Sequence, residues 1–151
     1  PKKSYFVIFP SPSGSHIGSP PQSERITVCD NHDMFSEVAS GSARWDSMII
    51  VPATMGTIAR IASGISQSLI ERSADVMLKE RRKLVIVARE APYSLIHLRN
   101  MTTLTEAGAI ILPASPSFYS HPQTLTEAAL TVVERIVAHL GVVLPRYKWG
   151  E

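Results

Sequence analysis

The chain has 151 residues, 44% of them hydrophobic, which is enough for one domain with a buried core. Its net charge of +2 is too small to indicate nucleic-acid binding, although a pI near 8.9 suits an anionic small ligand. The single cysteine, Cys29, excludes an internal disulfide and argues against a cysteine metal site. No apolar run reaches the roughly 20 residues that span a bilayer, and the N-terminus does not resemble a signal peptide, so we expect a cytoplasmic protein.

Short apolar runs alternate with segments of helical period along the chain. Four runs rich in Val and Ile lack a regular polar alternation, which is typical of strands buried on both faces of a parallel sheet. These runs cover residues 4–10, 47–53, 83–88 and 107–114. Helices are predicted over residues 56–63, 69–80, 94–107 and 125–140. The alternation predicts a three-layer, doubly wound α/β fold with a mostly parallel sheet, whose ligands bind at the carboxyl ends of the strands.

The predicted helix over residues 125–140 has the clearest amphipathic pattern. Its apolar residues recur at steps of three and four, and Glu127, Glu134 and Arg135 lie off this stripe. The stripe consists of Leu125, Ala128, Ala129, Val132, Val133, Ile136, Val137 and Leu140. Such a stripe is typical of a helix that packs against a core.

Two strands are followed by loops with the composition of a phosphate site. The first loop, residues 10–19, is rich in Ser and Gly, but its prolines lack backbone donors and no clear helix follows. A phosphate site and a plain connector both remain open for this loop. In the second loop, Thr54 and Thr57 flank Gly56 at the start of a helix. Their hydroxyl and N–H groups suit a phosphate or the polar edge of a ring, but the residues alone favour ordinary helix capping.

Arg89 and Glu90 stand where the third buried strand meets a loop. A partly desolvated Glu90 could exchange protons near neutral pH, and Arg89 could hold a phosphate by paired hydrogen bonds. The alternative, which these residues alone slightly favour, is a structural ion pair between the two. We expect His97 to be an ordinary helix residue, because no acid or nucleophile is spaced to complete a catalytic triad.

The fourth strand leads into a proline-rich loop, residues 112–125, which carries Phe118, Tyr119 and His121. Tyr119 has two possible roles. It could cover the edge of the sheet, or its phenol could donate a hydrogen bond to an anion or carry a proton.

Several blocks taken together resemble the flavin prenyltransferases, which were once described as aromatic acid decarboxylases (phenylacrylic acid and 3-octaprenyl-4-hydroxybenzoate decarboxylase-like flavoproteins). The blocks are ASGS at 39–42, ERSADVMLKERRKLVIVAREAPYSLIHLRNM at 71–101, and GAIILPASPSFYSHPQTL at 108–125. The resemblance runs from about Arg25 to LPRYKWGE at 144–151. It implies a Rossmann-like flavoprotein that transfers a dimethylallyl group from dimethylallyl phosphate to reduced FMN without a metal. The prenylated FMN would serve a partner decarboxylase in ubiquinone biosynthesis or aromatic acid decarboxylation.

The resemblance also implies roles for individual residues. The FMN site would contain Ser11, Pro12, Ser13, Thr54, Met55, Gly56, Thr57 and Arg89. The dimethylallyl phosphate site would contain Lys79, Arg89, Glu90, Tyr119 and Arg135, with Glu90 as the catalytic proton shuttle. Arg72 and Lys79 would act across a subunit boundary, because the family assembles as a homododecamer with sites at its interfaces.

Two features depart from the family pattern. Ser11, Pro12, Ser13 and Gly14 stand where the family has Gly-Ala-Ser-Gly. Residues 18–25 also stand where the family has a long helix, a strand and a further helix. We therefore expect a single flavoprotein domain over residues 1–151 that lacks a segment near 18–25. The alternative function is an FMN-binding homologue or assembly subunit without prenyl transfer. A flavin-dependent cysteine decarboxylase is less favoured, because its Asn-containing loop and His base are not found.

Overall fold

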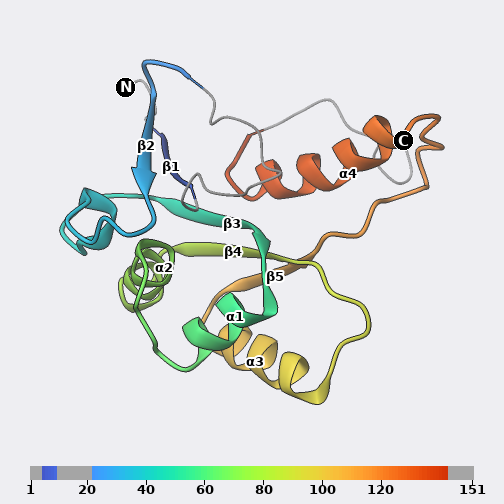
Figure 1. Ribbon diagram of the computed structural model, residues 1–151. Coiled ribbons are helices and arrows are strands. Elements are labelled where there is room, and N and C mark those ends of the chain that lie inside the picture. Colours follow the sequence, from blue (N-terminus) through green and yellow to red (C-terminus); the bar gives the residue numbers. More distant parts are fainter. Residues whose placement is uncertain (1–4, 10–21, 143–151) are drawn as a thin grey trace.

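A computed structural model describes residues 5–9 and 22–142 of the chain (Figure 1). Its strands are β1 (Tyr5–Phe9), β2 (Ile26–Asp30), β3 (Ser47–Ala53), β4 (Lys83–Ala88) and β5 (Ile110–Pro113). Its helices are the 3-10 helix η1 (Glu37–Ala39) and the α-helices α1 (Met55–Ala62), α2 (Leu69–Lys79), α3 (Leu95–Glu106) and α4 (Leu125–Ala138). The predicted strands and helices are thus confirmed, with ends that differ by up to three residues. In the described residues, no helix combines the length and the apolar character needed to cross a bilayer.

The strands form two parallel sheets. β3, β4 and β5 form a three-stranded sheet with β4 in the centre, and β1 pairs with β2 in a separate two-stranded sheet. The predicted first strand therefore pairs with β2, which the sequence pattern did not mark as a strand. β2 carries exposed side chains at Thr27, Val28 and Asp30, so it lacks the continuous apolar run of the other strands.

The central strand β4 separates two apolar layers. Leu84, Ile86 and Ala88 point to one face, where they belong to a core cluster with residues of α1, α2 and α3. Val85 and Val87 point to the other face, where Ile136 of α4 packs on them. Figure 1 shows α4 alone on one side of the sheet and the other three α-helices on the opposite side. This arrangement confirms the predicted three-layer α/β fold.

Helix α4 buries only part of its predicted apolar stripe. Val132 packs on the sheet beside Ile136. Leu125 is 91% exposed and Val133 is 43% exposed. The stripe thus packs on the core as predicted, but only in part in this single chain, because the stripe is wider than the contact that one helix makes with the narrow three-stranded sheet.

Helices α1 to α3 end in residues with left-handed backbone conformation, which closes the last turn with a hydrogen bond. Glycine fills this position after α1 (Gly64, φ 71°) and after α3 (Gly108, φ 104°), where a side chain would strain the backbone. After α2 the position is held by Arg81 (φ 56°), and the next N–H, that of Arg82, donates to the carbonyl of Met77 at 2.8 Å. The α2–β4 turn therefore carries backbone strain that the other two turns avoid.

Replacing Arg81 with glycine is expected to raise the free energy of unfolding by about 0.5–1 kcal/mol, because glycine adopts this backbone conformation without strain. Urea unfolding of both proteins measures the difference. The matched control is Arg99→Gly, an exposed arginine inside α3, where glycine should lower the free energy of unfolding by about 1 kcal/mol. A loss of stability in both variants would contradict the strain assigned to Arg81.

Candidate functional site

Three loops begin side by side at the carboxyl edge of the three-stranded sheet. Ala53, the last residue of β3, pairs with Ala88 at the end of β4, and Ala88 pairs with Pro113 at the end of β5. The N–H of Ala114 also donates to the carbonyl of Ala88 at 2.9 Å. The residues that follow these strand ends, including Thr54 and Arg89, therefore lie on adjacent loops. This is the edge at which parallel α/β sheets bind ligands.

Thr54 is the N-cap of α1, which confirms the capping interpretation. Its hydroxyl oxygen accepts a hydrogen bond from the N–H of Thr57 at 3.1 Å, and the two hydroxyl oxygens lie 3.0 Å apart. Met55 and Gly56 are the first residues of the helix, so their N–H groups have no acceptor within it. The start of α1 thus presents hydroxyl and N–H groups together, at the positive end of the helix dipole.

Arg60 and Glu71 form a partly buried ion pair between α1 and α2. The Glu71 side chain is 3% exposed, and its carboxylate accepts hydrogen bonds from the Arg60 Nε–H and from the backbone N–H groups of Gln67 (2.9 Å) and Ser68 (3.2 Å). Burial alone would raise the pKa of the Glu71 carboxyl, but these hydrogen bonds and the charge of Arg60 lower the pKa below its ordinary value. Glu71 is therefore held as an anion that caps α2 and fixes Arg60.

Replacing Glu71 with glutamine is expected to lower the free energy of unfolding at neutral pH by about 1–3 kcal/mol, because a charge-assisted hydrogen bond is lost. Since folding lowers the pKa of Glu71, its contribution is complete above the ordinary pKa of 4.5 and declines as the pH falls through the folded-state pKa. The difference between the two proteins should therefore shrink in acid. Urea unfolding at several pH values measures it, with the exposed carboxylate variant Glu106→Gln as the control. A difference that does not depend on pH would contradict the assignment.

Arg89 and Glu90 are both exposed at the end of β4. A carboxylate oxygen of Glu90 accepts a hydrogen bond from the N–H of Ala91 at 3.0 Å, and within the described chain the two residues form no ion pair with each other. The alternative of a structural ion pair is therefore wrong. The condition considered for Glu90, partial desolvation, is not met in the single chain, since the buried strand ends at Ala88 and Glu90 is exposed. Both side chains are open to a ligand.

Tyr119 lies on the loop between β5 and α4, which starts at the same edge. It is 68% exposed, as is Phe118 beside it. Such exposure does not fit the alternative in which Tyr119 covers the edge of the sheet. His97 is the third residue of α3 and forms a reciprocal capping box with Ser94, so the prediction of a structural role is confirmed.

A second cluster of charges lies at the opposite, amino edge of the sheet. Three side chains of this amino-edge cluster, Arg72, Lys79 and Arg82, surround the loop 39–43. Arg72 donates to the carbonyl of Ala39 at 3.0 Å, and Arg82 donates to the carbonyls of Ala43 and Gly41. Lys79 forms an ion pair with Glu80, and a Cβ on Gly41 would lie 2.7 Å from both charged groups. The ASGS block is therefore a loop held by cations.

The residues predicted to surround the prenyl phosphate are divided between these two edges. Lys79 ends α2 just before β4 begins, whereas Glu90 follows the end of β4. The six residues of β4, at about 3.3 Å each, separate the two edges by roughly 20 Å. Lys83, the first residue of β4, donates to the carbonyl of His139 at 2.7 Å, so the residue that follows α4 lies at the amino edge. Arg135 precedes Ile136, which packs on Val85 and Val87 in the middle of β4, so its backbone lies between the two edges. One chain does not bring Lys79 to Glu90.

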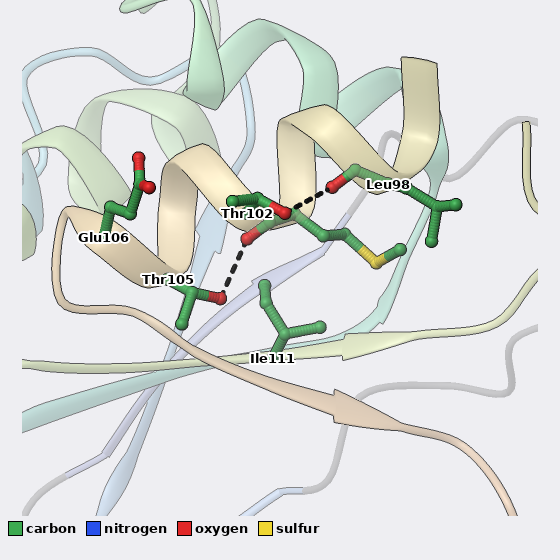
Figure 2. Close-up of a pocket in the computed structure, with 6 residues that line it drawn as sticks. Leu98, Thr102, Thr105, Glu106 and Ile111 are labelled. Carbon is green, nitrogen blue, oxygen red and sulfur yellow. Dashed lines mark hydrogen bonds between the residues drawn. The ribbon is translucent and has the colours of Figure 1, made fainter. Parts of the chain in front are cut away.

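A groove of about 310 Å³ lies between α3 and β5 (Figure 2). Leu98, Met101 and Ile111 line it together with Thr102, Thr105 and Glu106. The hydroxyls of Thr102 and Thr105 donate back to carbonyls of α3, at 2.9 and 2.8 Å, so they are not directed to a ligand. Among the described residues, no three His, Cys, Asp or Glu side chains are grouped so that they could hold a metal ion.

Sequence reasoning missed Arg60, Glu71 and Arg82 as residues that shape the two edges. Ser68 followed by Glu71 has the spacing of a capping box, which was a readable signal for the start of α2. The partners of Arg60 and Arg82 lie 11 and about 40 residues away, and no local pattern indicates them. The predicted FMN residues Ser11, Pro12 and Ser13 lie outside the described residues.

Comparison with known proteins places the chain among flavoproteins. The family model described as Flavoprotein matches residues 17–142. A Pseudomonas aeruginosa protein named Flavin prenyltransferase UbiX is 48% identical over 130 residues, which make up 84% of this chain and 61% of that protein. A protein of the same name from Methanocaldococcus jannaschii is 44% identical over 80% of this chain and 66% of its own length. The chain thus spans less than two thirds of the length of these relatives.

Solved structures give the same result. A crystal structure of AnUbiX (PadA1) in complex with FMN and dimethylallyl pyrophosphate has a TM-score of 0.78 and 46% identity, over 82% of this chain and 68% of the other. A dodecameric FMN-dependent UbiX-like decarboxylase from Escherichia coli O157:H7 has a TM-score of 0.79 and 41% identity over the same shares. The chain therefore belongs to the flavoprotein family, and its sequence is similar to proteins named flavin prenyltransferase.

Proposed function

We propose that this chain binds FMN at the carboxyl edge of its sheet and transfers a dimethylallyl group from dimethylallyl phosphate to the reduced flavin. The observation that carries the proposal is the pairing of Ala53 with Ala88, which sets the Thr54 loop beside Arg89 and Glu90. The similarity to a structure that contains FMN and dimethylallyl pyrophosphate supports it.

The residues at this edge fit a phosphorylated flavin. The start of α1 offers the N–H groups of Met55 and Gly56, the hydroxyls of Thr54 and Thr57, and the positive end of the helix dipole, which are all donors for an anion or a ring carbonyl. Arg89 adds an exposed guanidinium on the adjacent loop. When bound and reduced, FMN would supply the nucleophilic ring that accepts the prenyl group. Ser11, Pro12 and Ser13 stay proposed contacts to it.

The chain's own side chains would assist the departure of phosphate. Negative charge builds up on the phosphate as its bond to the prenyl carbon breaks, so a cation at Arg89 and a hydroxyl donor at Tyr119 would lower the barrier. Glu90 is exposed and, among the described residues, accepts a hydrogen bond from the N–H of Ala91. It would take up the proton that leaves the flavin and deliver it to the phosphate.

The amino-edge cations would enter the site from a second copy of the chain. Lys79 lies roughly 20 Å from Glu90 along β4, so it reaches a phosphate there only across a subunit boundary. Arg72 would act in the same way. Arg135 stays a proposed contact to the phosphate. The dodecameric structural relative supports a homo-oligomer, and we propose a dodecamer. A decarboxylase that uses prenylated FMN would be the partner, and the cytoplasm the location, where the free Cys29 stays reduced.

Incubation of the purified protein with reduced FMN and dimethylallyl phosphate tests this function. Mass spectrometry should detect prenylated FMN, and samples without protein or without the prenyl donor should not contain it. FMN binding without any such product would favour the second candidate, an FMN-binding homologue or assembly subunit. That candidate is motivated by the altered loop at Ser11–Gly14 and by our proposal that the single domain lacks a segment near residues 18–25.

A further inference from the structure

A continuous chain of hydrogen bonds joins a buried carboxylate to the start of α1. Glu71, which is 3% exposed, accepts a hydrogen bond from the Nε–H of Arg60. The Nη2–H of the same guanidinium donates to the hydroxyl oxygen of Thr57 at 3.4 Å, and that hydroxyl lies 3.0 Å from the hydroxyl of Thr54. This series of hydrogen bonds runs from the interior between α1 and α2 to the exposed end of β3.

The guanidinium of Arg60 is fixed from two sides. On one side Glu71 is itself fixed by the N–H groups of Gln67 and Ser68. On the other side the Nη1 atom lies against Gly56, where a Cβ would be only 3.3 Å away. Arg60 therefore reaches back along α1 into space that a side chain at position 56 would narrow. The side chain of Arg60 therefore contacts the start of α1, although the residue itself lies near the end of the helix.

The hydroxyl groups of Thr54 and Thr57 are only partly used by the hydrogen bonds within the protein, so some donor and acceptor capacity remains for a ligand. The hydroxyl oxygen of Thr57 accepts from Arg60, and the hydroxyl oxygen of Thr54 accepts from the N–H of Thr57. Two hydroxyl protons remain, and one of them forms the bond between the two hydroxyls. One O–H donor is left over, together with one acceptor lone pair, because three of the four lone pairs on the two oxygens accept these bonds. Since a guanidinium only donates, Arg60 occupies one lone pair of Thr57 and fixes the position of the hydroxyl pair that presents this O–H donor.

We propose that Arg60 is a positioning residue that fixes the Thr57 hydroxyl, so that the Thr54–Thr57 pair offers one O–H donor to an acceptor atom of the flavin. Glu71 holds the guanidinium in the required orientation. This inference rests on the proposed FMN site and adds a residue that does not touch the flavin itself. It assigns the donor to a particular pair of hydroxyls, where the sequence indicated only polar residues around a glycine.

A double-mutant cycle on FMN affinity tests this role. FMN is titrated into wild-type protein, Arg60→Gln, Thr57→Val and the double variant, and the quenching of flavin fluorescence is followed. Arg60→Gln should weaken binding about tenfold, or about 1.4 kcal/mol, when Thr57 is present. In the Thr57→Val background, Arg60→Gln should alter the dissociation constant less than twofold, because the hydroxyl that Arg60 binds is already gone. Arg99→Gln, an exposed arginine on α3, is the matched control and should leave affinity unchanged.

This inference would be overturned if Arg60→Gln lowered FMN affinity equally in the wild-type and Thr57→Val backgrounds, since an Arg60 with a merely structural role acts independently of Thr57. Unfolding curves of each variant separate affinity from folding. If Arg60→Gln does not fold, Arg60→Lys replaces it in the cycle, because lysine keeps the charge near Glu71 but lacks the planar fork that reaches both partners. Wild-type protein that does not bind FMN would overturn the proposed function and this inference together. Wild-type binding with no coupling would overturn this inference alone.

Discussion

Replacing Glu90 with glutamine is expected to lower the rate of prenylated FMN formation by at least about 100-fold, the usual contribution of a positioned acid or base. The side chain keeps its size and its ability to accept a hydrogen bond from the N–H of Ala91. It loses the capacity to carry a proton. FMN affinity should change less than about twofold, because the donors at the start of α1 remain in place. Single-turnover assays with quantification by mass spectrometry measure the rate.

Glu106→Gln is the control for this variant, since Glu106 is an exposed carboxylate on α3 at a distance from the site. Its rate should match that of the wild-type protein. Comparison of the Glu90→Gln rate across pH provides a second readout, because loss of a proton carrier should remove a limb of the pH–rate profile. An unchanged rate in Glu90→Gln would exclude this carboxylate from the chemistry and would leave the proton transfer without an assigned residue.

Co-assembly of two inactive variants is expected to restore activity. Lys79→Ala and Glu90→Gln each remove one part of the proposed site, at opposite edges of the sheet. If the two residues come from different copies, a mixed oligomer contains sites formed by the intact Lys79 of one copy and the intact Glu90 of another. Random assembly of equal amounts makes about one quarter of the sites complete, so about one quarter of wild-type activity should return.

Co-expression with two affinity tags yields the mixed oligomers, and sequential purification selects those that contain both variants. Oligomers of each variant alone should stay at least about 100-fold below wild type, as expected for lost transition-state stabilisation. If Lys79 and Glu90 acted within one chain, no arrangement of the mixture would contain a complete site. Activity of the mixture no higher than that of either variant would therefore contradict a shared site.

The strands and helices were predictable because their signals are local. The apolar runs of β3 and β4 mark strands buried in a parallel sheet, and Ser68, Ser94 and Thr124 mark the starts of α2, α3 and α4. β2 was not predicted, since its exposed residues give it a mixed pattern. The extent to which α4 is buried could not be predicted, because a periodic stripe does not show how wide its contact with the sheet is.

The site could be predicted only in part. A strand that ends in Arg89 and Glu90 and a Thr-Met-Gly-Thr helix start indicate a carboxyl-edge site, because parallel strands bring their ends together. The sequence does not show at which edge of the sheet Lys79 lies, because its charge is compatible with either edge. The partners of Arg60 and Arg82 depend on how helices and a loop pack after folding, and no sequence spacing encodes those contacts.

The one-sided cover of the sheet has a consequence for motion. Three helices protect one face, whereas α4 alone protects the other, and Ile136, 7% exposed, is the one residue of this fully described helix that is buried. Few buried contacts mean a low free energy of local opening. In an isolated chain, α4 should detach while the sheet and α2 stay intact, so its amide protons should exchange with solvent deuterium well before those of β4.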